Sequence, residues 1–197
     1  TKKLEAYTVS GAAQAIESLS DDMSRWYIRR SRDRFQSNAR GDMSQEADWE
    51  VASQTLETVL STTAKLMAPF MPFFSEALYK SMGHEASVHL ADWPAVEHTR
   101  IDQQLLNDME IVRNLAAQAL ALRAEAKIKV RQPLASLTIK NIALQGKAEL
   151  LKLLSDEVNV KEIRFGKEFL LDTAVTPALK EEGILRDLTR TIQGLRQ

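Results

Sequence analysis

The sequence predicts a mainly α-helical protein: a helical bundle, followed by a small α/β module of β-α-β order and a C-terminal helix. Apolar residues recur at intervals of three and four along much of the chain, which is the spacing of amphipathic helices. Only seven glycines and five prolines occur in 197 residues, so most of the chain should lie in regular elements. After Pro133 short β-branched runs appear. We therefore expect a bundle over 1–132 and the α/β module over 133–197.

Caps and prolines delimit the first helices of the bundle. Residues 9–35 supply one or two helices. Another helix begins near Asp42, with a glutamine three residues on as its capping-box partner, and Pro69 ends or kinks it. Pro72 suits the first turn of a further helix, which ends around Gly83.

The clearest apolar stripe lies in the middle of the chain. It follows Asp102, a residue that can cap a helix. Its members recur at three and four residues: Leu105, Leu106, Met109, Val112, Leu115, Ala119 and Leu122. The stripe predicts one long amphipathic helix, which joins the others in the bundle.

The module after Pro133 alternates strand-like and helical stretches. "LASLTIKNI" is short and β-branched, "GKAELLKLLSDE" is helical, and "VNVKEIRF" is again strand-like. Leu134 to Phe165 is therefore predicted to form a β-α-β unit. A last helix should run from about Pro177 to the end of the chain.

Composition limits where the protein works. No run of about 18 apolar residues occurs, and the opening "TKKLEAYTVSG" has neither an h-region nor a cleavage site. We expect no membrane insertion, no secretion and a cytoplasmic location. Because the chain opens with Thr1 rather than Met, we expect a domain excised from a longer protein.

Signs of catalytic or metal chemistry are sparse. His84, His89 and His98 are not spaced to share one helix face, and the chain has no cysteine. Glycines are scattered singly, so no phosphate-cradling loop is predicted, and no G-x-S-x-G elbow occurs. We expect no metal site, no cofactor and no catalytic residue in this chain.

The stretch from Arg25 to Phe35, here called the arginine segment, concentrates positive charge. Five arginines against Asp33 give it a local charge of +4, in a chain of formal net charge −1. A helical wheel at 100° per residue separates its residues into two sides. One arc holds Trp26, Tyr27, Arg30 and Arg34, and the other side holds Arg25, Arg29 and Arg32.

Two interpretations of this segment remain open from charge alone. In the first, Trp26 and Tyr27 pack in the core, Arg30 and Arg34 pair with carboxylates inside the bundle or serve interdomain contacts, and the outer arginines are only solvated. In the second, the outer arginines bind phosphates bidentately and the interleaved aromatic residues stack on bases.

A second basic cluster lies in "LRAEAKIKVRQPL". The helix must stop before Pro133, and if Lys127 to Arg131 is extended, Lys127, Lys129 and Arg131 project to one side over about 13 Å. This spacing roughly matches successive phosphates on a nucleic-acid strand, although a solvated exit strand is an equal alternative. Two local clusters in a near-neutral chain favour a polyanionic partner that binds locally.

The motifs themselves resemble a known family. "DDMSRWYIRRSRDRF" closely resembles the segment that opens the anticodon-binding helical bundle of isoleucyl-tRNA synthetases. "LMAPFMPFFSEALY", "SVHLADWP" and "AEAKIKVRQPLASL" follow in that family's order. "DEVNVKEIRF" and "TPALKEEGILRDLTRTIQGLRQ" resemble its downstream module, so the resemblance covers Tyr7 to Gln197.

This resemblance implies a tRNA-binding part of an isoleucine-tRNA ligase. The HIGH-type and KMSKS-type signatures that use ATP and Mg²⁺ in such enzymes do not occur here, so the chain alone should lack the catalytic and editing domains and be inactive. The implied partners are the anticodon stem-loop of an isoleucine tRNA and the catalytic domain of the same polypeptide. Phosphate contacts are expected from Arg25, Arg29, Arg32, Lys127, Lys129 and Arg131.

Two alternatives stay open beside this interpretation. The chain could be a non-catalytic helical scaffold for protein-protein or interdomain contacts, with arginines serving only ion pairs. It could also be a different nucleic-acid-binding bundle.

Overall fold

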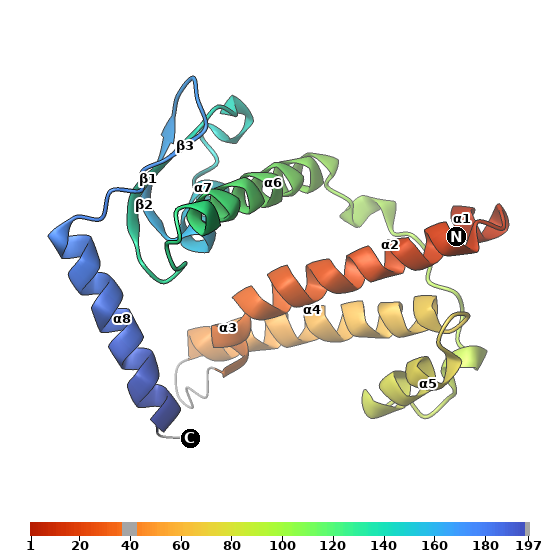
Figure 1. Cartoon of the computed structure of the whole chain (residues 1–197). Coiled ribbons are helices and arrows are strands. Elements are labelled where there is room, and N and C mark those ends of the chain that lie inside the picture. The colour runs from red at the N-terminus through yellow and green to blue at the C-terminus, as the bar shows by residue number, and fades with distance from the viewer. Residues whose placement is uncertain (37–42, 196–197) are drawn as a thin grey trace. The chain divides into compact units, whose positions relative to one another are not determined.

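The computed structural model describes residues 1–36 and 43–195. Most of the described residues are helical, and a small mixed sheet lies in the C-terminal half (Figure 1). The prediction of a mainly α protein with a small α/β module is confirmed. The chain divides into two compact units, a first unit of Thr1–Glu97 and a second unit of His98–Gln197.

The first unit consists of helices. In chain order they are α1 (Lys2–Glu5), α2 (Val9–Asp22), η1 (Met23–Ile28), α3 (Arg32–Gln36), α4 (Met43–Met67), α5 (Pro72–Ser81) and η2 (Val88–Leu90). Helices α2 and α4 lie side by side and antiparallel (Figure 1). The predicted cap at Asp42 lies outside the described residues.

Local chemistry ends and starts the helices around α5. Helix α4 stops at Met67, two residues before Pro69, and Pro72 occupies the first turn of α5, both as predicted. Glu76 then ties η2 to α5, because its carboxylate accepts hydrogen bonds from Ser87 Oγ at 2.9 Å and Val88 N at 2.8 Å. These two bonds lower the pKa of Glu76, the Val88 amide contributing most.

The second unit combines helices with the sheet. Its elements are η3 (His98–Arg100), α6 (Gln103–Glu125), β1 (Leu134–Ile139), η4 (Ile142–Leu144), α7 (Ala148–Val158), β2 (Val160–Phe165), β3 (Leu170–Leu171) and α8 (Pro177–Leu195). The side chain of Asp102 accepts a hydrogen bond from Leu105 N at 2.9 Å, so the predicted cap of α6 is confirmed.

The predicted β-α-β unit is confirmed. Strands β1 and β2 pair in parallel, with Leu134 opposite Val160 and Ile139 opposite Phe165, and α7 makes the crossover between them. The sheet order is β2-β1-β3, and β3 pairs antiparallel with β1. The sequence analysis did not predict β3, because two residues are too short to show an alternating pattern.

Helix α6 lies in the second unit, where it packs against α7 and β3. The division into compact units falls between Glu97 and His98, and the domain boundary at 132 and 133 stays a prediction. The apolar stripe of α6 is also covered only in part. Val112, Leu115 and Ala119 are buried, whereas Leu105 and Leu106 in its first turn are exposed.

Within the described residues, no helix is both long enough and apolar enough to cross a membrane.

Candidate nucleic-acid interface

The arginine segment begins in a π-helical turn. Helix α2 passes at Met23 into η1, whose i→i+5 hydrogen bonds enclose more residues per turn than an α-helix. The wheel at 100° per residue therefore loses its phase inside the segment. Such turns often occur at functional sites.

Three arginines that the wheel placed on the outer side are exposed. Arg25 makes an exposed ion pair with Asp21 at 3.2 Å, one helical turn earlier. Arg29 Nε donates to the carbonyl oxygen of Arg25 at 2.7 Å, and Arg32 opens α3. All three arginines are helical residues, so helix geometry fixes the backbone from which each guanidinium group extends.

The two arginines of the predicted inner arc do not share one environment. Arg34 is half-buried and forms a bidentate pair with Asp48, with Nε–Oδ2 at 2.9 Å and Nη2–Oδ1 at 2.8 Å. The hydrogen bonds of this pair raise the pKa of Arg34 and lower that of Asp48. Arg30 is exposed instead, and a turn at Ser31 separates it from Arg34, which lies in α3.

The aromatic residues of the segment are half-buried. The hydroxyl of Tyr27 donates to the carbonyl oxygen of Ala52 in α4 at 3.0 Å. Its ring also meets that of Phe35 edge-on, with centroids 6.4 Å apart. Trp26 is half-buried rather than fully enclosed. Tyr27 therefore joins this helix to α4.

The second cluster, Lys127–Gln132, forms a turn and is here called the basic turn. Lys127 has a φ of +55°, so the chain reverses at the end of α6. Gln132 N then donates to the carbonyl oxygen of Lys129 at 3.0 Å, which closes a second tight turn. The expectation of an extended strand is therefore wrong, and with it the straight line of three cations.

The cations of the basic turn are nevertheless exposed. Lys127, Lys129 and Arg131 all lie at the surface. Arg131 Nη1 lies 3.3 Å from Asp187 Oδ1 on α8, so its charge is partly compensated within the second unit. Residues beneath the turn, which the sequence analysis missed, explain why this segment is a turn and not an extended strand.

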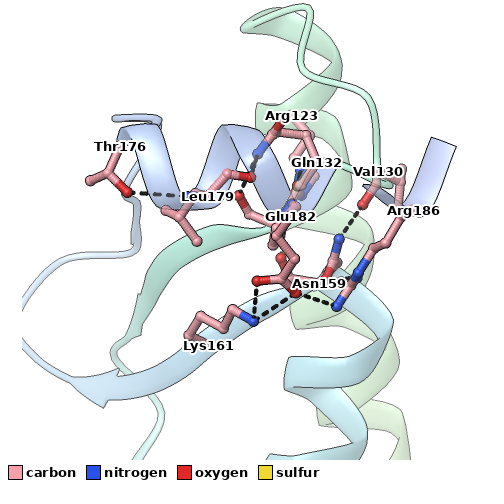
Figure 2. A network of polar contacts seen from close by, with 10 residues as sticks. Arg123, Val130, Gln132, Asn159, Lys161, Thr176, Leu179, Glu182 and Arg186 are labelled. Atoms are coloured by element: carbon pink, nitrogen blue, oxygen red, sulfur yellow. Dashed lines mark hydrogen bonds and ion pairs between the residues drawn. The ribbon is translucent and has the colours of Figure 1, made fainter. Parts of the chain in front are cut away.

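Those missed residues form a polar network under the basic turn (Figure 2). Arg123, in the last turn of α6, donates to the carbonyl oxygens of Lys129, Gln132 and Asn159. A sequence signal did exist for it. Arg123 follows Ala119 by four residues, so an arginine stands in register with the buried stripe of α6.

One of the three histidines packs against an aromatic ring. His84 stacks on Tyr79 with ring centroids 3.8 Å apart and lies 3.4 Å from Ser61 Oγ. Among the described residues, no group of three histidine or acidic side chains gathers in a way that could hold a metal ion.

Comparisons with known proteins place this geometry in context. Residues 1–139 match the family model "Anticodon-binding domain of tRNA ligase". Isoleucine–tRNA ligase of Porphyromonas gingivalis is 40% identical over 168 residues, which cover 83% of this chain and 14% of that protein. The enzyme of Nocardia farcinica is 37% identical over 163 residues, covering 83% of this chain and 15% of that protein.

The relatives are much longer than this chain. The match to isoleucine–tRNA ligase of Deinococcus radiodurans, 35% identical over 189 residues, covers 93% of this chain but only 17% of that protein. The chain thus spans about a sixth of the length of the curated relatives it matches. The family model itself matches 139 of 197 residues and includes both basic clusters. The chain therefore belongs to the family of anticodon-binding domains of tRNA ligases.

Proposed function

We propose that this chain binds the anticodon stem-loop of an isoleucine tRNA as part of an isoleucine–tRNA ligase. The family match over residues 1–139 carries the proposal. Isoleucine is proposed as the amino acid because the relatives are named isoleucine–tRNA ligases. Two exposed basic clusters on a chain of net charge −1 supply the electrostatics that a local RNA contact needs.

In this proposal the arginine segment and the basic turn both contact RNA phosphates, each from a different element. Arg25, Arg29 and Arg32 contact phosphates from a helix, and Lys127 and Lys129 do so from the basic turn. Arg131 also contacts a phosphate while it keeps its ion pair with Asp187. Arg30 lies at the surface, where RNA or the catalytic domain can approach it, while Arg34 stays with Asp48. Such contacts set the register of the RNA and do not read its bases.

The chemistry of the whole ligase lies outside this chain. We propose that ATP and Mg²⁺ bind elsewhere in the cytoplasmic enzyme, and that the catalytic domain of the same polypeptide is the second partner. This follows from the short span of the match and the lack of class I signatures. The 197-residue chain by itself should then show background isoleucine-dependent ATP-pyrophosphate exchange. Robust exchange by this chain would contradict that assignment.

A salt titration of RNA affinity tests the RNA proposal. In the full-length protein, Arg29→Gln with Arg32→Gln should weaken binding of the anticodon stem-loop. It should also flatten the slope of log K against log salt by roughly 0.7 to 0.9 for each lost phosphate contact. The matched control replaces two exposed lysines outside both clusters, Lys152→Gln with Lys167→Gln, which removes the same charge.

The outcomes separate the alternatives. A scaffold predicts no RNA binding by the unmodified protein even at low salt. A general nucleic-acid binder predicts equal affinity for stem-loops with other anticodons. Equal loss of slope in the control and the arginine variant would show that the effect reflects net charge and not a defined surface.

A further inference from the structure

Arg123 is an unusual residue to find inside the second unit. Its side chain is only 1% exposed, among the buried residues of α6. Within the described part of the chain, no carboxylate pairs with it and its Nε has no hydrogen-bond partner. A buried guanidinium without a counter-charge is costly, and an apolar side chain in the same register would avoid that cost. Stability of the helix therefore does not explain why an arginine stands here.

What Arg123 supplies is a set of donors for the chain that follows it. Nη1 donates to the carbonyl oxygen of Lys129 at 3.2 Å and to that of Gln132 at 2.9 Å. Nη2 donates to the carbonyl oxygen of Asn159 at 2.7 Å, at the junction of α7 and β2. The planar guanidinium can satisfy these acceptors at once, which an ammonium group cannot do with the same geometry.

Asn159 fixes the basic turn at a further point (Figure 2). Its Nδ2 donates to the carbonyl oxygen of Val130 at 2.8 Å, while its Oδ1 accepts from Arg186 Nη1 at 2.8 Å. Arg186 also bonds Glu182, which in turn pairs with Lys161 of β2. The orientation of the Asn159 amide is thereby set by α8 and the sheet.

Gln132 closes the basic turn from its other end. Its Nε2 donates to the carbonyl oxygen of Leu179 in α8 at 2.6 Å. The carbonyl oxygens of residues 129, 130 and 132 are therefore all held from beneath by side chains. Lys127 and Lys129 are both exposed. Within the described chain, neither ammonium group has a hydrogen-bond or ion-pair partner.

Lys127 itself sits in a conformation that suits a different residue. Its N–H donates to the carbonyl oxygen of Ala124 and that of Ile128 to Arg123, the two bonds of a Schellman motif. The residue with positive φ in this motif is usually glycine, because a side chain there is strained. A strained lysine and a buried arginine without a counter-charge thus lie at the same few residues.

We propose that Arg123 is a positioning residue for RNA binding, which holds the basic turn in the shape that presents Lys127 and Lys129 to RNA phosphates. The inference rests on the proposed function. A backbone that is already fixed loses little conformational freedom when phosphates bind, so each lysine contact contributes more to affinity. The residues that hold the turn, Arg123, Asn159 and Gln132, are not themselves RNA contacts.

Lys127→Gly gives the first test, because function and stability should change in opposite directions. In the full-length ligase, glycine relieves the strain at positive φ, so the melting temperature should stay the same or rise. Affinity for anticodon stem-loop RNA should fall, and the salt slope should flatten by roughly 0.7 to 0.9. Unchanged affinity and slope would overturn the role of Lys127 and with it the proposal.

A double-mutant comparison gives the test of positioning. Lys127→Gln with Lys129→Gln should flatten the salt slope by roughly 1.4 to 1.8, the sum of two phosphate contacts. In an Arg123→Lys background the same pair of changes should flatten it by less than half as much, because the lysines are no longer held in place. Equal effects in both backgrounds would overturn the proposal.

Asn159→Gly keeps the test decisive if Arg123→Lys fails to fold. Glycine accepts the left-handed backbone at this position, where φ is +56°, and removes the amide that holds Val130 and accepts from Arg186. The same loss of coupling is expected. If the unmodified ligase binds no stem-loop RNA, the proposed function fails and takes this inference with it. If it binds but the coupling is absent, only this inference fails.

Discussion

The two compact units bury different kinds of side chain. In the described part of the second unit most of the fully buried residues are large and aliphatic, among them Leu137, Ile139 and Leu154 on the sheet and the helix that covers it. In the first unit the fully buried residues are small, such as Ala52, Ala64 and Ser75. Large apolar side chains are exposed in both units, including Phe73 and Leu90 in the first and Ile142 and Leu185 in the second.

The two basic clusters rest on these different cores. Close helix packing through alanine and serine buries little apolar area per residue, so the first unit draws less stabilisation from its own core. The arginine segment is held there by helix geometry, Tyr27 and Asp48. The basic turn of the second unit stands on a dense core and a polar network. We expect the basic turn to be the more rigid of the two basic clusters.

The largest expected difference between the units is in the stability lost when one large apolar residue is truncated in each. Leu137→Ala opens a cavity in the central strand, where the side chain is 0% exposed, and should cost about 2 to 5 kcal/mol. Phe73→Ala removes a side chain that is 91% exposed and should cost less than about 0.5 kcal/mol. Equilibrium urea unfolding measures both. Equal losses would show that the face of α5 is covered by other parts of the protein.

An ion pair with a buried carboxylate sharpens the comparison through the pH dependence of stability. Asp108 of α6 is buried and bonded to Lys147 Nζ and to Gln104 Nε2. The bond from Lys147 is the main cause that lowers the pKa of Asp108 below its ordinary value. A carboxylate with a lowered folded-state pKa stabilises the fold above its unfolded pKa, and this stability is lost as pH falls through the folded value.

Asp108→Asn should therefore lower the melting temperature at neutral pH. The gap from the unmodified protein should be complete above about pH 5 and close progressively below about pH 4, where the aspartate itself takes up a proton. Thermal melts across this pH range measure the gap. Glu110→Gln, a change of an exposed acid on the same helix, is the control and should show no such closure. A gap that persists at low pH would mean that the pair contributes through packing and not through charge.

The parts of the fold that were predicted from sequence have local causes. Asp102, Pro72 and Pro177 start helices because their own side chains favour helix starts. The β-α-β unit followed from short β-branched runs around an amphipathic helix. The two-residue strand β3 was missed because it exists only by pairing with β1, which lies more than thirty residues earlier.

The candidate site was harder to predict because its geometry depends on distant partners. The π-helical turn interrupts the regular helix and the turn at Ser31 separates Arg30 from Arg34, and no residue pattern in the segment indicated either. The basic turn depends on Arg123, whose acceptors lie 6, 9 and 36 residues further along the chain. The exposure of Arg25, Arg29 and Arg32 agrees with the helical wheel, but their contact with RNA stays a prediction.

The smallest expected effect concerns Arg34, which distinguishes a structural arginine from an RNA contact within the first unit. Its pair with Asp48 is bidentate, yet both side chains are partly exposed, at 33% and 53%. Solvent and salt screen such pairs, so Arg34→Gln, Asp48→Asn and the double variant should show a coupling of no more than about 2 to 4 °C in melting temperature. The RNA salt slope of Arg34→Gln should equal that of the unmodified protein, because its charge is already paired with the Asp48 carboxylate. Arg29→Gln is the matched comparison, one arginine on the same segment, and should flatten the slope while leaving the melting temperature nearly unchanged. A slope flattened equally by both changes would place Arg34 on the RNA-facing side and show that the pair with Asp48 opens when RNA binds.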